Sequence, residues 1–183
     1  MIKIVSFPRS GQHLIERFLN FYHKENNLNY SYCDYYNHCM KIPCVNNCIF
    51  QKNHDWNLNL EIKKSEKFIV LYRSNIEKQL NSFYRHNTNK SILIKNSDVI
   101  DYLNFFNEKK KYYNGFINKW VENSNENILK IDYEKLILEP NLNLELILSH
   151  IIENYNKKSI SNFLKKEKIN NRYKKIKIIK LFK

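Results

Sequence analysis

An uninterrupted apolar run near the middle of the chain, Phe68–Tyr72, sets the first limit on the fold. A strand that is apolar at every position is buried on both faces, which is typical of parallel sheets covered by helices on both sides. Less uniform runs of similar character occur at Met1–Ser6, Cys48–Gln51 and Ile128–Ile131. The sequence therefore predicts a sheet whose strands are spread along the chain.

The segments between these runs have the periodicity of helices. Leu14, Phe18 and Tyr22 recur at intervals of four residues, as on one face of an amphipathic helix. Helical spacing also occurs in four further segments: 75–86, 98–123, 142–152 and 160–164. Alternating strands and helices predict an α/β fold, a P-loop-like three-layer domain with a central, mainly parallel sheet flanked by helices. At this length we expect residues 1–183 to form a single domain.

The charge of the chain is concentrated at its C-terminal end. Lys and Arg number 31 against 18 acidic residues, a net charge of +13. Residues 157–183 alone carry eleven Lys and Arg against a single acid, Glu167. This basic C-terminal segment suits an anionic partner such as nucleic acid, or it is a solubilising terminus. Because no stretch approaches the ~20 apolar residues of a membrane span and no secretory signal is recognisable, we expect a cytoplasmic protein.

All the cysteines of the chain lie in one short segment, as Cys33, Cys39, Cys44 and Cys48. Their spacing, C-x5-C-x4-C-x3-C, is not the paired C-x2-C pattern of common zinc modules. Disulfides are rare in the reducing compartment that we expect. Three interpretations stay open: ordinary free thiols, a structural metal site or disulfide knot, and local redox chemistry.

The segment Ser6–Leu14 links the first predicted strand to the first predicted helix. Backbone N–H groups at the start of a helix favour an anion, and the helix dipole adds to this preference. Gly11 allows the main chain to approach a ligand closely. Arg9 supplies a cation whose planar fork matches phosphate or sulfate, and the side chains of Ser10, Gln12 and His13 are possible donors. The segment predicts an anion site; the alternative is a plain strand–turn–helix corner.

Phe7–Leu14 resembles the 5′-phosphosulfate-binding loop of sulfotransferases that use 3′-phosphoadenosine 5′-phosphosulfate (PAPS). That loop usually reads Pro-[Lys/Arg]-Ser-Gly-Thr-[Thr/Ser], and Gln12 and His13 replace its two hydroxylated residues here. The resemblance implies that Arg9 and residues 10–14 bind PAPS. These residues are Arg9, Ser10, Gly11, Gln12, His13 and Leu14.

Three further segments resemble the same family, in the same order. Lys52 and His54 are similar to the family's Lys-x-His, which implies that His54 is the catalytic base. Arg73, directly after the central strand, is similar to the arginine that binds the 3′-phosphate. The family's serine eight residues further on corresponds to Asn81, with Ser82 next to it.

The last matches lie toward the C-terminus. Tyr133 belongs to a Tyr-Glu-Lys-Leu segment similar to one whose tyrosine lies near the nucleotide. The family's closing Arg-Lys-Gly segment is not clearly present; Arg172 stands in for it without the glycine. The resemblance covers about residues 1–140 and implies a nucleotide-binding transferase with PAPS as its co-substrate.

The chemistry of these residues agrees with sulfuryl transfer, which requires a cationic cradle, charge stabilisation and a base. The resemblance places Arg9 and Lys52 beside the transferred group as cations. His54 suits the role of base because an imidazole titrates near neutral pH. Neither this chemistry nor the sequence calls for a catalytic metal ion. Asp55, the next residue, offers the alternative that His54 is only one half of a salt bridge.

The acceptor and the competing functions stay open. The Tyr- and Cys-rich segment 26–50 lies where the family binds acceptors, so we expect a carbohydrate or another small hydroxylated acceptor. One alternative is a P-loop-like phosphotransferase (kinase), with Asp132 as the nearest candidate for a Mg²⁺ ligand. Another is a basic nucleic-acid-binding module without catalysis, and a third is an inactive nucleotide-binding relative.

Overall fold

The computed structural model describes residues 1–88 and 99–167. Its centre is a five-stranded sheet in the order β2-β3-β1-β4-β5, and all its strands are parallel. The strands are β1 (Ile2–Ser6), β2 (Tyr32–Asp34), β3 (Phe50–Asn53), β4 (Lys67–Tyr72) and β5 (Ile128–Asp132). The predicted central parallel sheet is confirmed. The short edge strand β2 was not predicted, because its segment has no apolar periodicity.

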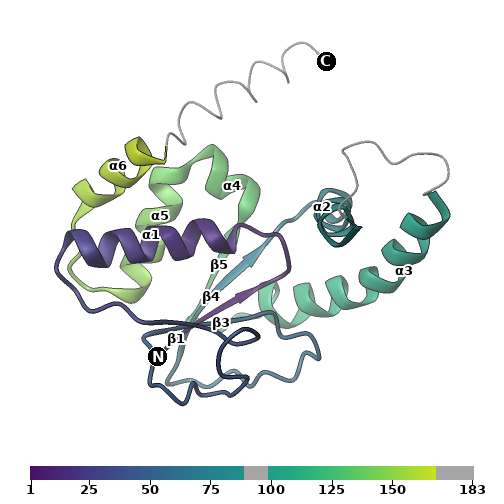
Figure 1. Ribbon diagram of the computed structural model, residues 1–183, viewed down its shortest axis with the longest axis horizontal. Helices are drawn as coiled ribbons and strands as arrows, with labels where there is room; N and C mark the ends of the chain where they lie inside the picture. The colour runs from purple at the N-terminus through teal and green to yellow at the C-terminus, as the bar shows by residue number, and fades with distance from the viewer. Residues whose placement is uncertain (89–98, 168–183) are drawn as a thin grey trace, which may run out of the picture.

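Helices cover both faces of this sheet (Figure 1). They are α1 (Gln12–Glu25), α2 (Ile76–Thr88), α3 (Val99–Phe116), the π-helical turn η2 (Ile117–Val121), α4 (Tyr133–Leu138), α5 (Pro140–Ile151) and α6 (Lys157–Lys166). Helices α1, α4, α5 and α6 lie on one face, and α2 and α3 lie on the other. The predicted three-layer α/β fold is therefore confirmed. The predicted basic segment 157–183 is described only as far as residue 167.

Two apolar cores result from the alternation of side chains along the strands. In β4, Ile69 and Leu71 pack under the layer that contains α1, whereas Phe68 and Val70 face the layer of α2 and α3. All four side chains are fully buried. An uninterrupted apolar run is what a strand with two covered faces requires. Trp120, interpreted from the sequence as a core residue, is also fully buried.

The order of the strands fixes where the functional loops meet. Strand β1 has β3 on one side and β4 on the other, so the chain changes direction across the sheet at β1. Ligands of open α/β sheets bind outside the carboxyl ends of the strands at such a point. The ladders pair Val5 with Asn53, and Ser6 with Leu71. The residues that follow β1, β3 and β4 therefore come together at one edge.

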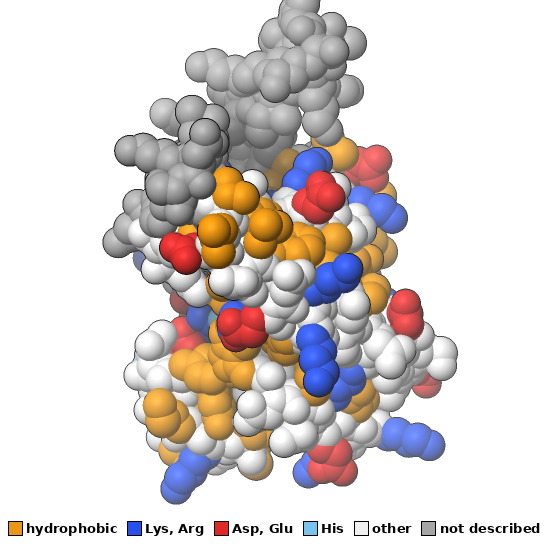
Figure 2. All heavy atoms as spheres, turned by 90° about the vertical axis from the view of Figure 1, so that its right-hand side faces the viewer, with side chains coloured by type: hydrophobic (Ala, Val, Ile, Leu, Met, Phe, Trp, Pro, Cys, Tyr) orange, Lys and Arg blue, Asp and Glu red, His pale blue; other side chains and the backbone are white. Residues whose placement is uncertain are grey.

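The face formed by α2 and α3 exposes apolar side chains. Figure 2 views the molecule from this side and shows a patch of hydrophobic side chains. Helix α3 contributes exposed Ile100 and Leu103. Within the described ranges, no helix has the length and apolar character needed to cross a membrane.

Candidate active site

A cavity of about 460 Å³ opens at the carboxyl edge of the sheet, between the loops that follow β1, β3, β4 and β5. Most of the residues singled out in the sequence line it. These are Arg9, Gly11, Gln12, His13, Leu14, Lys52, His54, Arg73, Ser82 and Tyr133. Two others, Ser10 and Asn81, do not line it, and Arg172 lies outside the described residues. Segments far apart in the sequence are therefore brought to one place.

The loop after β1 is shaped by a close approach of its glycine to Tyr133. Gly11 has a φ of +85°, in the left-handed region, and caps the N-terminus of α1. A Cβ atom at Gly11 would lie 2.3 Å from Cδ2 of Tyr133. No acidic residue occupies the first turn of α1, so the positive end of this helix faces the cavity without a competing carboxylate from that turn.

Gln12, the first residue of α1, offers a donor to the cavity. Its Oε1 accepts a hydrogen bond from the Ser6 hydroxyl at 2.7 Å. Its Nε2 is buried and has no hydrogen-bond partner among the residues that the structure describes. Because an unsatisfied buried amide is costly, a ligand oxygen at this position would be stabilising.

Ser10 has a different position from the one that the resemblance implies. Its side chain is fully buried and donates to Oε1 of Gln79 in α2 at 2.9 Å. Nε2 of Gln79 in turn donates to the carbonyl of Pro8. The Ser10 hydroxyl therefore anchors the loop after β1 to α2 through a buried hydrogen bond. Sequence reasoning missed Gln79, since nothing local marks a helix residue that supports a loop 69 residues away.

Arg73 follows β4 and lies between Tyr133 and Glu134. The centre of its guanidinium is 4.3 Å from the centroid of the Tyr133 ring, and its Nη1 is 3.6 Å from Oε1 of Glu134. Burial raises the pKa of Glu134 above its usual value, while the positive charge of Arg73 acts in the opposite direction. Nε of Arg73 is buried without a hydrogen-bond partner in the described part of the chain. Arg73 therefore retains donor capacity for an anion.

The structure separates Ser82 from Asn81, which the sequence left as alternatives for the same role. Ser82 lines the cavity together with Arg73. Asn81 lines a different hollow, between α2 and α3, together with Tyr102 and Phe106. Adjacent residues on a helix point about 100° apart, since the helix has 3.6 residues per turn. Of these two residues, Ser82 therefore shares the cavity with Arg73 and Asn81 does not.

The ring of His54 is fixed in one orientation. Its Nδ1 lies 2.7 Å from the carbonyl oxygen of Ser6 and 3.1 Å from the Ser6 hydroxyl. A carbonyl only accepts hydrogen bonds, so Nδ1 carries the proton and Nε2 of the neutral ring keeps its lone pair. The ring also stacks on Tyr36, with centroids 5.6 Å apart and planes 18° from parallel. This places a basic nitrogen at the cavity.

Two neighbours of His54 are engaged elsewhere. Nζ of Lys52 lines the cavity but donates to Oδ2 of Asp34 at 2.9 Å. Burial alone would raise the pKa of Asp34, but Lys52, together with hydrogen bonds from Asn37 and Tyr36, holds it below its usual value. Asp55 accepts from Lys119 at 2.7 Å and from the Trp120 indole at 2.8 Å. The alternative of a His54–Asp55 salt bridge is therefore replaced by a buried structural network.

Burial governs the protonation of His54. It lowers the pKa of His54 from 6.5 to about 4, although the bond to Ser6 acts in the opposite direction. The ring is therefore neutral throughout the physiological range.

Stability should consequently depend on pH through His54. Its folded-state pKa is depressed, so between about pH 6.5 and 4 the unfolded chain binds more protons than the folded chain. The contribution of His54 to the free energy of unfolding is present in full above about pH 6.5 and is lost as the pH falls toward 4. We expect the excess stability of the wild type over His54→Asn to shrink by up to about 3 kcal/mol across this window. Urea unfolding of both proteins at several pH values measures this, and a constant difference would contradict it.

The charged side chains that line the cavity are cationic, although Arg17, Lys52 and Arg73 are paired with Glu167, Asp34 and Glu134 outside its lining. Arg9, Arg17, Lys52 and Arg73 line it, and no carboxylate does among the residues that the structure describes. Sequence reasoning missed Arg17, although its i+4 spacing from His13 on α1 was a usable signal. It also missed Trp56, which lines the cavity two residues after His54. Such a site can hold a polyanion and place a neutral imidazole beside it.

The fold is an α/β architecture of the P-loop-like kind, and the loop after its first strand opens onto the cavity. A solved structure with the same fold is that of mouse sulfotransferase SULT7A1 complexed with PAP, with a TM-score of 0.63 and 15% sequence identity. The match covers 90% of this chain and 62% of that one, so the chain spans less than two thirds of that neighbour's length. No protein-family model and no curated protein matches the sequence.

Proposed function

We propose that this protein is a PAPS-dependent sulfotransferase, which moves the sulfuryl group from PAPS to a hydroxyl of a carbohydrate or another small acceptor. One observation carries the proposal: the segment Phe7–Leu14, which we call the anion loop, and Arg73 open onto the same cavity and are joined through Tyr133. Its ring contacts Gly11 on one side and stacks on Arg73 on the other. Two cationic subsites in one cavity suit a nucleotide with phosphate groups at both ends.

In the proposed reaction, different residues bind the two ends of the nucleotide and accept the proton. The N–H groups at the start of α1, the Gln12 amide and Arg9 would hold the 5′-phosphosulfate. Arg73 and Ser82 would hold the 3′-phosphate. As the acceptor oxygen bonds to sulfur and the S–O bond to the phosphate breaks, Nε2 of His54 would take the hydroxyl proton. PAP, the desulfated nucleotide, leaves with the charge of the broken bond.

Lys52 has a more specific role in this proposal. It is bonded to Asp34 in the structure, so it stabilises the departing phosphate only by exchanging that partner. In the free protein, Asp34 therefore keeps the Lys52 side chain in place through this hydrogen bond.

A second function class, phosphoryl transfer, is less well supported by the geometry. Asp132, the acid that it would use, is buried and caps α4 by accepting from the N–H of Glu134 at 2.9 Å. It does not line the cavity. Nucleic-acid binding through the basic C-terminal segment stays a prediction, since residues beyond 167 are outside the described part of the chain.

Isothermal titration with PAP tests the proposed function. We expect binding by the wild type and a loss of about 10- to 100-fold in Arg73→Ala, since hydrogen bonds to charged groups contribute about 1.5–3 kcal/mol. Ser82→Ala should weaken binding by a smaller factor. Asn81→Ala, one position away on the same helix, is the matched control and should bind like the wild type. A wild-type protein that does not bind PAP would overturn the proposal.

A further inference from the structure

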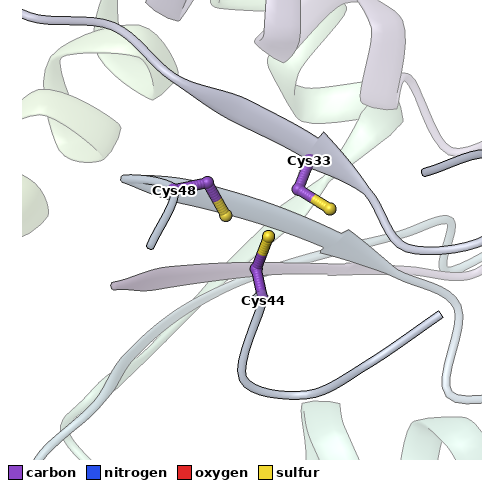
Figure 3. A group of neighbouring side chains, drawn as sticks. All are labelled: Cys33, Cys44 and Cys48. Atoms are coloured by element: carbon purple, nitrogen blue, oxygen red, sulfur yellow. The ribbon is translucent and has the colours of Figure 1, made fainter. Parts of the chain in front are cut away.

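The cysteines form a cluster of their own, away from the cavity described above. Cys33 lies on β2, Cys44 in the loop that follows, and Cys48 just before β3. All three are buried, and their sulfur atoms lie within 4.8 Å of one another. Figure 3 shows the three side chains pointing toward a common centre from these separate segments. None of them is in a disulfide.

Cys39 adds a fourth thiol to this cluster. Its Sγ is 3.1 Å from Sγ of Cys33, well beyond the ~2.05 Å of a disulfide bond. Four thiolates around Zn²⁺ lie about 2.3 Å from the metal, which places sulfur atoms about 3.8 Å from one another in a tetrahedron. The sulfur atoms of Cys33, Cys44 and Cys48 are close enough for this arrangement, whereas Cys39 approaches Cys33 but lies outside the group whose sulfur atoms are all within 4.8 Å of one another. Binding of the metal therefore requires a side-chain movement of Cys39 to complete the tetrahedron.

The loop between β2 and β3 is held by polar contacts and has only a very small apolar core of its own. Its buried apolar cluster consists of cysteines alone: Cys33, Cys44 and Cys48, with Cys39 packed against them. Two of its residues, Met40 and Asn47, adopt left-handed backbone conformations. A segment with so small a core is commonly fixed by a metal or by disulfides.

A buried side chain on β3 supports the cluster from outside. Nε2 of Gln51 donates to the carbonyl of Lys41 at 2.7 Å and lies 3.7 Å from Sγ of Cys39. Gln51 is 1% exposed. Hydrogen-bond donors of this kind orient metal ligands and disperse the charge of thiolates.

We propose that Cys33, Cys39, Cys44 and Cys48 bind one Zn²⁺ ion as a tetrahedral structural site that holds the β2–β3 loop in place. Four thiolate ligands in tetrahedral geometry favour zinc over magnesium or calcium, and a site closed by four protein ligands is structural rather than catalytic. The proposal stands on the geometry of the thiols and is independent of the sulfotransferase assignment.

The zinc site would also stabilise one side of the candidate active-site cavity. Asp34, which holds Lys52, follows Cys33 directly on β2. Tyr36, which stacks on His54, lies between Cys33 and Cys39. Loss of the metal should therefore loosen two contacts of the candidate catalytic residues without touching the anion loop.

Metal analysis of the full-length protein, purified under reducing conditions without added chelator, tests the proposal. We expect about one zinc per chain, and four thiols released together with the zinc on titration with an organomercurial. Substitution with Co²⁺ should give the visible absorption of a tetrahedral tetrathiolate site. Iron in place of zinc, no bound metal, or thiols already paired in disulfides would each overturn it.

Variants assign the ligands. Cys44→Ser should lose zinc, whereas Val45→Ser, at the exposed neighbouring position of the same loop, should keep it. Cys39→Ser should bind zinc at least about tenfold more weakly in a chelator competition, and unchanged affinity would overturn the four-ligand site. If Cys44→Ser does not fold, the mercurial titration of the wild type still decides, because it counts thiols per zinc without a mutation.

Discussion

Replacing His54 with alanine should lower turnover by about 10²- to 10⁴-fold, the usual contribution of a general base, and leave the affinity for PAP unchanged. The neutral ring offers Nε2 to an acceptor while Nδ1 is held by Ser6. Nothing in the arrangement uses this ring to hold the phosphates. Two measurements test this prediction: steady-state turnover with a hydroxylated acceptor, and calorimetric titration with PAP.

Two further variants separate chemistry from structure in this experiment. His54→Asn keeps an N–H donor near the position of Nδ1 but has no base, so it should be as inactive as the alanine variant. His13→Ala removes an exposed imidazole at the rim of the same cavity and should retain most of the turnover. Full activity in His54→Ala would show that another group takes the proton.

The second large effect is expected from Gly11→Ala. A methyl group there would lie 2.3 Å and 2.6 Å from two carbon atoms of the Tyr133 ring, and a left-handed φ costs an alanine about 1–2 kcal/mol. Tyr133 cannot yield freely, because Arg73 is stacked on its ring. Since a displacement of 1 Å can cost about 10²-fold in rate at a positioned site, we expect turnover to fall by about that factor and PAP binding to weaken with it.

The chain supplies its own control for this substitution. Its only other glycine, Gly115, lies inside α3 without a positive φ, and a Cβ there would meet only the end of the Leu58 side chain. Leu58 can rotate away, and alanine favours a helix over glycine by about 1 kcal/mol. Gly115→Ala should therefore bind PAP normally. Equal binding by the two variants would contradict the proposed role of the loop.

Local patterns were sufficient for much of this molecule. An apolar run such as Phe68–Tyr72 can be buried on both faces only between two layers of helices. The same residues therefore predict both the strand and the helices that cover it. His54 and Arg73 each follow a strand directly. Because all the strands are parallel, such residues necessarily meet at one edge, and their convergence could be predicted.

Features that depend on rotation about a helix, or on a non-periodic loop, could not be predicted. Asn81 and Ser82 differ by one step of α2, and only the packing of that helix decides which of them faces Arg73. The side chain of Ser10 turns inward because Gln79, distant in sequence, accepts its hydrogen bond. The convergence of the thiols arises in a segment with no periodicity.

Ser6, the last residue of β1, holds both sides of the site. Its carbonyl positions the imidazole and its hydroxyl positions Gln12. Under the proposed function, one strand end therefore links the proton acceptor to the residue that binds the anhydride, and Tyr36 and Asp34 add contacts to His54 and Lys52. If the proposed function holds, residues of the 26–50 segment other than Asp34, Tyr36 and the cysteines can vary with the acceptor while the contacts made by Ser6 stay the same.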